Sequence, residues 1–236
     1  AMAIGSGYYR PLVEEFERRG WAARALSRRG FEREGPRASR ADDWGYADEI
    51  DDIAQAVDAA RQEDPERPVL ALGHSLGGQL LVGHNQLHAA TDGMITIGAA
   101  LPHHRNFPRG GIPLLLMGGV IVPGATTLFG HLPKPAFGAP GARTLMREWG
   151  RMAVTGRPPY PLHHRISTPT LIISLEGDNL APVKAVNAFA RDLFEPSAVT
   201  RWHYLDDEVP EGATNDHITW VRSPEAVVDR TLSWWD

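Results

Sequence analysis

Apolar residues recur along the chain at two spacings, one typical of helices and one typical of strands. A spacing of three or four residues predicts helices over residues 8–19 and 46–62, because the apolar side chains then share one face. Short apolar runs between polar or glycine-containing segments predict strands. We expect strands at 21–26, 69–72, 94–97, 170–174 and 199–204, and further helices at 76–90, 142–154, 183–194 and 224–235. Strands that alternate with helices predict an α/β fold, with a mostly parallel sheet and helices on both of its faces.

Residues 101–165 interrupt this alternation because they are rich in proline and glycine. We expect an insertion there that forms a cap or lid. It would separate an N-terminal part of the core, residues 1–100, from a C-terminal part, residues 166–236.

The most apolar part of the insertion is Ile112–Phe129, which carries no charged residue. Pro113 and Pro123 are expected to interrupt a helix in this segment, so we expect no stable membrane insertion. Such a large apolar segment normally covers something, and we expect it to line a substrate pocket. The side chains expected in the pocket wall are Leu116, Met117, Val120 and Phe129.

A glycine-rich turn follows the strand expected at 69–72. Residues Gly73–Gly78 fit the pattern G-x-S-x-G, in which a serine lies on a sharp turn between a strand and a helix. We expect Gly73 and Gly77 to keep neighbouring side chains out of the way, and Gly78 to let the helix approach the sheet closely. Ser75 would then lie at a helix N-terminus, where free N–H groups favour developing negative charge. Ser75 is therefore the candidate nucleophile.

A serine nucleophile needs a general base and a carboxylate that orients the base. In this arrangement the acid follows a late strand and the histidine comes after the last strand. Asp178 follows the strand at 170–174, and His217 lies in the loop beyond the strand at 199–204. Glu176 is an alternative acid, only two residues from Asp178.

Other polar residues near these positions are weaker candidates for catalytic or metal-binding roles. Asp206 and Asp207 are expected to be solvated, and alternation along the strand is expected to bury His203. His74 is expected to help shape the substrate pocket while pointing away from the Ser75 hydroxyl. The adjacent pairs His103–His104 and His163–His164 do not make a metal site, because neighbouring side chains diverge.

Together these residues resemble the α/β-hydrolase superfamily over nearly the whole chain. Residues 177–182 look like its acid loop, and residues 215–220 look like its histidine loop. Within the superfamily, the chain looks most like bacterial predicted hydrolases related to the serine aminopeptidase branch. That closer match is carried by residues 8–11, 73–78, 130–133 and 147–149. The resemblance implies an α/β-hydrolase fold with a cap insertion.

The start of the chain departs from this pattern. The resemblance implies an oxyanion hole made by the backbone N–H of Leu76 and that of Met2 or Ala3. In the family, strands usually precede the loop that corresponds to Met2 and Ala3, and these strands are absent from the sequence. The sequence leaves open whether the chain is an N-terminally truncated product or has a short sheet.

Length, charge and composition indicate the number of domains, the kind of partner and the compartment. A length of 236 residues suits one α/β domain, and a net charge of −5 gives no reason to expect a nucleic-acid partner. The chain has no cysteine and shows no signal peptide, and we expect a cytoplasmic protein. The oligomeric state stays open.

The expected function is that of a serine hydrolase without metal or cofactor. It would cleave an ester, thioester or amide of a small, mostly apolar acyl substrate through an acyl-enzyme. An acyltransferase with the same three residues is one alternative, and a non-catalytic ligand-binding protein on the same scaffold is another.

Overall fold

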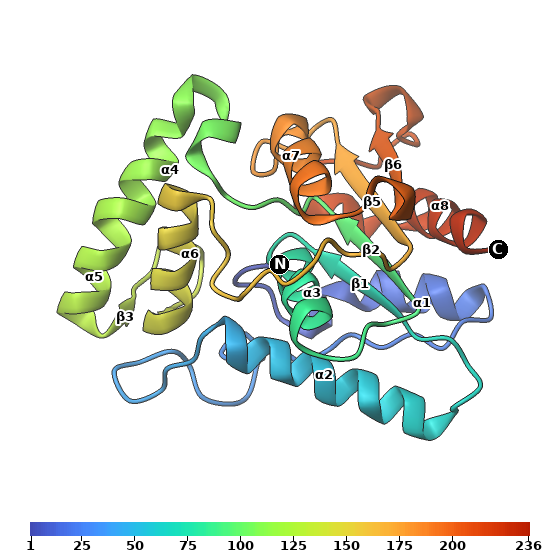
Figure 1. The fold of residues 1–236 in the computed structure, drawn as a ribbon, viewed down its shortest axis with the longest axis horizontal. Helices are drawn as coiled ribbons and strands as arrows, with labels where there is room; N and C mark the ends of the chain where they lie inside the picture. The colour runs from blue at the N-terminus through green and yellow to red at the C-terminus, as the bar shows by residue number, and fades with distance from the viewer.

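The fold is built around a parallel sheet, as the sequence predicts, and this sheet has four strands where five were expected. The structure is a computed structural model that describes residues 1–236. The strands lie side by side in the order β1-β2-β5-β6, and every neighbouring pair is parallel. They span β1 Leu70–His74, β2 Gly93–Ile97, β5 Thr170–Leu175 and β6 Val199–Tyr204 (Figure 1).

Helices cover both faces of this sheet. Alternate strand residues point to opposite faces, so Met94 and Ile172 join one hydrophobic cluster while Ile95 and Ile173 join another. The first cluster also contains residues of α2 (Tyr46–Glu63), α3 (Leu76–Leu87) and α7 (Val183–Leu193). The second contains residues of α1 (Arg10–Arg18) and α8 (Glu225–Trp235).

One expected strand is absent: residues 21–26 have no strand conformation. A strand needs a neighbour for its backbone hydrogen bonds, and β1, at the edge of the sheet, pairs only with β2. The other expected strands are present, and the expected helices outside the insertion agree to within a few residues. Short 3₁₀ turns complete this part at Ser6–Tyr9, Pro196–Ala198, Asp206–Glu208 and Thr219–Arg222.

Between β2 and β5 the chain forms a helical layer at one side of the molecule (Figure 1). It contains the 3₁₀ turns His104–Asn106 and Pro108–Gly111, then α4 (Ile112–Leu116), a π-helical turn (Met117–Ile121), α5 (Val122–Phe129) and α6 (Arg143–Thr155). A two-stranded antiparallel sheet joins β3 (His131–Leu132) to β4 (Gly141–Ala142).

The expectation that two prolines interrupt the apolar segment is wrong. Helix runs without a break from Ile112 to Phe129, because Pro113 lies in the first turn of α4, where its missing N–H costs nothing. Pro123 lies in the first turn of α5, directly after the π-helical turn. The wider turn changes the hydrogen-bond pattern where Pro123 cannot donate.

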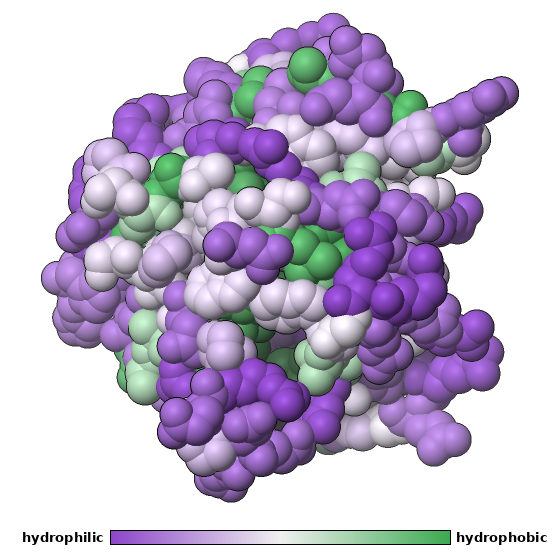
Figure 2. Space-filling view, turned by 90° about the vertical axis from the view of Figure 1, so that its right-hand side faces the viewer, coloured by the Kyte–Doolittle hydropathy of each residue, from purple (hydrophilic) through white to green (hydrophobic).

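The apolar helix is unusually exposed. The helical stretch Pro108–Phe129 is long and apolar enough to cross a membrane: an 18-residue window within it has a mean hydropathy of 1.8, and 17% of that window is buried. By contrast, the side of the molecule opposite the insertion is mainly hydrophilic, with small separate apolar areas (Figure 2). More than half of the exposed large apolar side chains of the chain lie on the insertion.

Candidate active site

Ser75 lies on a strained turn between β1 and α3. Its backbone has φ 55° and ψ −117°, a conformation that costs energy for any residue except glycine. The turn is held in place by the Ser75 amide, which donates to the Ile97 carbonyl over 2.9 Å. This sharp turn places the Ser75 hydroxyl beyond the end of β1, at the N-terminus of α3.

The neighbouring glycines permit the turn by close approach. A Cβ atom at Gly73 would lie 2.6 Å from the backbone of Gly77 and Gly78, and one at Gly78 would lie 2.4 Å from the Ala99 Cβ. Gly73 and Gly78 therefore have the expected roles. Gly77 does not, because a Cβ there would meet nothing within 4 Å.

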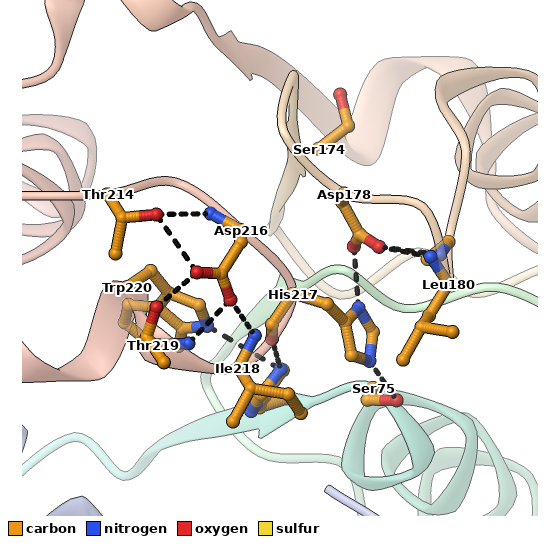
Figure 3. A network of polar contacts seen from close by, with 12 residues as sticks. Ser75, Ser174, Asp178, Leu180, Thr214, Asp216, His217, Ile218, Thr219 and Trp220 are labelled. Carbon is orange, nitrogen blue, oxygen red and sulfur yellow. Dashed lines mark hydrogen bonds and ion pairs between the residues drawn. The ribbon is translucent and has the colours of Figure 1, made fainter.

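Ser75, His217 and Asp178 form a continuous chain of hydrogen bonds (Figure 3). The distance from His217 Nδ1 to Asp178 Oδ2 is 2.6 Å, and that from His217 Nε2 to Ser75 Oγ is 2.9 Å. Because a carboxylate only accepts, Nδ1 carries the proton and Nε2 has a free lone pair facing the serine hydroxyl. The histidine is thus oriented to accept the Ser75 proton. Ser75 is half-buried, whereas the other two side chains are buried.

The acid loop holds Asp178 in this position. Asp178 Oδ1 accepts hydrogen bonds from the Leu180 and Ala181 amides at 2.7 and 2.8 Å, which leaves Oδ2 for the histidine. Glu176 lies elsewhere: its Oε2 accepts from the Asp206 amide at 2.8 Å. Of the two candidate acids, the structure therefore brings Asp178 to His217.

The histidine loop is held by a carboxylate that the sequence reasoning missed. Asp216 accepts 2.8 Å hydrogen bonds from the Ile218 and Thr219 amides, and further bonds from the Thr214 and Thr219 hydroxyls (Figure 3). Partial burial raises the pKa of Asp216, but these hydrogen bonds outweigh burial and lower it to about 2. A signal was present in the sequence, because an aspartate followed by threonine three residues later is typical of a side-chain-capped turn.

His74 supports His217 from behind instead of shaping the substrate pocket. Its Nε2 donates to the His217 carbonyl at 2.7 Å, and its Nδ1 accepts from the Tyr9 hydroxyl at 2.9 Å. Burial lowers the pKa of His74 well below its usual value, so the ring stays neutral with one donor and one acceptor nitrogen. The side chain is only 3% exposed and packs against Trp220, which corrects the expectation of a substrate contact.

The comparison with known families agrees with this geometry. A family model described as "Serine aminopeptidase, S33" matches residues 2–137, which is more than half of the chain and includes Ser75. The chain belongs to this family of α/β-hydrolases. Asp178 and His217 lie outside the matched region, so their assignment rests on the hydrogen bonds. No curated protein sequence shows significant similarity to this chain.

Solved structures share the fold of this α/β-hydrolase. A monoacylglycerol lipase from Paleococcus ferrophilus has a TM-score of 0.62 at 16% identity, over 99% of this chain and 92% of that chain. A pyrethroid hydrolase from Sphingobium faniae has a TM-score of 0.63 at 18% identity, over 98% and 92%. A thermophilic esterase from Thermogutta terrifontis has a TM-score of 0.63 at 16% identity, over 100% and 86%. At these identities the likeness shows the fold alone.

The two expected oxyanion donors, the amides of Leu76 and Met2, lie in different parts of the fold. Leu76 is the first residue of α3, where a helix leaves its amides without intrahelical partners. Met2 packs with its side chain against the cluster that contains Leu76, and its amide makes no hydrogen bond within the chain. The pairing of Met2 with Leu76 in an oxyanion hole stays a prediction.

The expected wall of the acyl pocket stays a prediction, and most of its side chains are open to solvent in this structure. Leu116, Val120 and Phe129 are 53%, 63% and 49% exposed. Gly118 and Gly150 bring the apolar helix and α6 into close contact, and this contact turns the opposite side of the helix outward. Met117 is the exception, since it packs against the main cluster.

The remaining candidate residues lie apart from the hydrogen-bonded chain. His203 is half-buried on β6 and its Nδ1 lies 2.9 Å from the Ser174 hydroxyl. Asp206 and Asp207 are exposed, as expected. An unexpected neighbour is Gly98, where a Cβ would lie 2.9 Å from Asp178 Oδ2, so only glycine fits beside the acid.

Proposed function

We propose that this α/β-hydrolase is a serine hydrolase that cleaves an ester, thioester or amide through an acyl-enzyme. The observation that carries the proposal is the Ser75–His217–Asp178 chain, with the serine on a strained turn at a helix N-terminus. Ser75 and His217 are within the distance at which a base takes a proton from a nucleophile.

The reaction follows from the donor and acceptor at each atom. His217 Nε2 takes the hydroxyl proton while Ser75 Oγ attacks the substrate carbonyl carbon. The negative charge that develops on the carbonyl oxygen is stabilised by the Leu76 amide and a second amide, for which we propose Met2. His217 then gives its proton to the leaving group, which departs as the acyl-enzyme forms. In the second half of the reaction His217 takes a proton from a water molecule that attacks the acyl carbon, and it returns a proton to Ser75 Oγ as the bond between Oγ and the acyl group breaks.

Asp178 keeps the histidine in the required tautomer and stabilises its cationic form. Leu180, whose amide is bound to Asp178, is largely exposed next to this pair and offers an apolar contact for a substrate (Figure 3). This contact supports a small, mostly apolar acyl group.

Labelling with a fluorophosphonate probe tests the nucleophile. Wild type should be modified at Ser75, as mass mapping would show, and Ser75→Ala should be unlabelled, with ester turnover lower by about a thousandfold or more. Ser233→Ala is the matched control, because Ser233 is exposed on α8. Labelling that survives in Ser75→Ala would refute the assignment, and analysis of products in the presence of alcohols separates hydrolysis from acyl transfer.

A further inference from the structure

One helix of the insertion presents an apolar surface to solvent. We define the cap face as the exposed large apolar side chains of the insertion helices. It comprises Ile112, Leu116, Val120, Ile121, Leu128 and Phe129 of the α4–α5 helix and Val154 of α6. Residues 112, 116, 120 and 128 repeat at multiples of four, so they form one stripe along the helix. More than half of the exposed large apolar side chains of the whole chain lie on this face.

The stripe faces outward because the opposite side of the helix is fully used in packing. A Cβ at Gly118 would lie 2.7 Å from the Gly150 carbonyl oxygen, so the two helices touch through their backbones. Val122 and Thr126 are buried, and Arg147 donates to the Thr126 hydroxyl at 2.9 Å. A helix fixed in this way lies on the protein surface and is not free to cross a bilayer.

Charge is distributed very unequally between the insertion and the rest of the chain. Residues 101–165 contain eight Arg or Lys and one Glu, a formal charge of +7. The other 171 residues contain sixteen Arg or Lys and 28 Asp or Glu, a formal charge of −12. The single acid, Glu148, accepts a hydrogen bond from the Tyr46 amide and so faces α2. The insertion is therefore a cationic surface on an acidic protein.

Cationic side chains border the cap face. Arg109 is exposed just before the helix begins, and Arg40 donates to the Leu128 carbonyl at its other end. Arg147 and Arg151 are exposed on α6, the helix that packs along its length. An apolar stripe bordered by arginine is complementary to the surface of a bilayer that contains anionic lipids. The apolar side chains can insert into the interface, and the arginine side chains can bind the anionic headgroups.

We propose that the cap face docks reversibly on bilayers that contain anionic lipids, with the α4–α5 helix lying along the bilayer surface. The same charges disfavour a second copy of the chain as the occupant, because a symmetric dimer would bring two cationic borders together. This inference does not depend on the proposed chemistry, since docking is measured without turnover.

Sedimentation with vesicles tests the proposal on the full chain. Wild type should bind vesicles of phosphatidylcholine and phosphatidylglycerol, bind phosphatidylcholine vesicles much more weakly, and be released by high salt. The double variant Leu116→Ser, Val120→Ser should lower the partition coefficient by about tenfold or more. Its control is Leu87→Ser, Leu205→Ser, which removes two exposed leucines from the body of the protein.

A second pair of variants tests the charges. Arg109→Glu, Arg151→Glu should weaken binding to the anionic vesicles, whereas Arg33→Glu, Arg222→Glu should retain most of it, since both control residues are exposed outside the insertion. Thermal melts check that each variant is folded. Equal binding to neutral and anionic vesicles would overturn the proposal. A lack of binding to the anionic vesicles would overturn it as well, and a wild-type dimer that the leucine and valine variant abolishes would then assign the cap face to a second copy of the chain.

Discussion

At the scale of single residues, the position of one carboxylate decides which side chain can orient the base. Asp178 reaches His217 because its other oxygen is bound by two backbone amides, and Glu176 is engaged with the Asp206 amide. We expect Asp178→Asn to lower ester turnover by about a thousandfold or more, because the histidine loses its tautomer control. Glu176→Gln is the matched control and should change turnover by less than about threefold. Steady-state kinetics with a soluble ester measures both, and the reverse ranking would assign the acid role to Glu176.

Asp216 is expected to act on the reaction through the position of His217. Removing its carboxylate in Asp216→Ala leaves two loop amides without partners, so stability should fall by about 1–3 kcal/mol. A displaced histidine should lower kcat by up to about a hundredfold while KM changes little. Asp207→Ala is the control, since Asp207 is exposed. A variant that loses stability but keeps its kcat would limit Asp216 to folding.

The sequence identified the three hydrogen-bonded residues because each follows a strand within a local pattern. It did not identify their supports, because the contacts of Tyr9 with His74 and of His74 with the His217 carbonyl join residues far apart in the chain. His74, next to the nucleophile, could point toward the substrate or behind the catalytic histidine, and its direction depends on the packing of the folded protein.

At the scale of elements, the largest difference between expectation and structure is the α4–α5 helix. Prolines that would disrupt a regular helix are tolerated because one lies in a first turn and the other follows a π-helical turn. Sequence periodicity finds amphipathic helices, and this segment is apolar nearly all round. The expected strand at 21–26 fails for a different reason, since pairing depends on a neighbour that local sequence does not specify.

The contact between this helix and α6 should be sensitive to single methyl groups. Gly118→Ala places a Cβ 2.7 Å from the Gly150 carbonyl oxygen, and we expect a loss of about 1–3 kcal/mol in the free energy of unfolding. Gly124→Ala is the matched control in the same helix, where a Cβ would meet nothing within 4 Å. Alanine is the better helix former, so the control should be stabilised by up to about 1 kcal/mol. Urea unfolding of both variants measures the difference, and equal effects would contradict the close packing.

At the scale of the whole molecule, the insertion shares a hydrophobic core with the body. Leu145, Met146 and Met152 of α6 belong to the same buried cluster as Leu80 of α3 and Ile172 of β5. The three segments expected from the sequence are therefore continuous through one core on this face of the sheet. Such packing favours unfolding of the insertion and the body in a single transition.

Buried neutral histidines should make that transition sensitive to acid. Burial is the main cause that lowers the pKa of His84 to about 4, and burial likewise lowers the pKa of His74. In the unfolded chain both titrate near their usual value of about 6.5, so below that pH the unfolded state binds protons that the folded state does not. Stability is therefore greatest above pH 6.5 and falls toward pH 4, by up to about 1.4 kcal/mol per pH unit for each extra proton.

Urea unfolding from pH 7.5 down to 4.5 measures this dependence. His84→Gln removes one of the histidines whose pKa is lowered by burial, so its stability should fall less steeply below pH 6.5 than that of wild type. His163→Gln is the matched control, because His163 is exposed and its substitution should leave the slope unchanged. The comparison of slopes holds even where a variant is less stable at every pH. Parallel curves for wild type and His84→Gln would show that His84 does not contribute to the acid sensitivity.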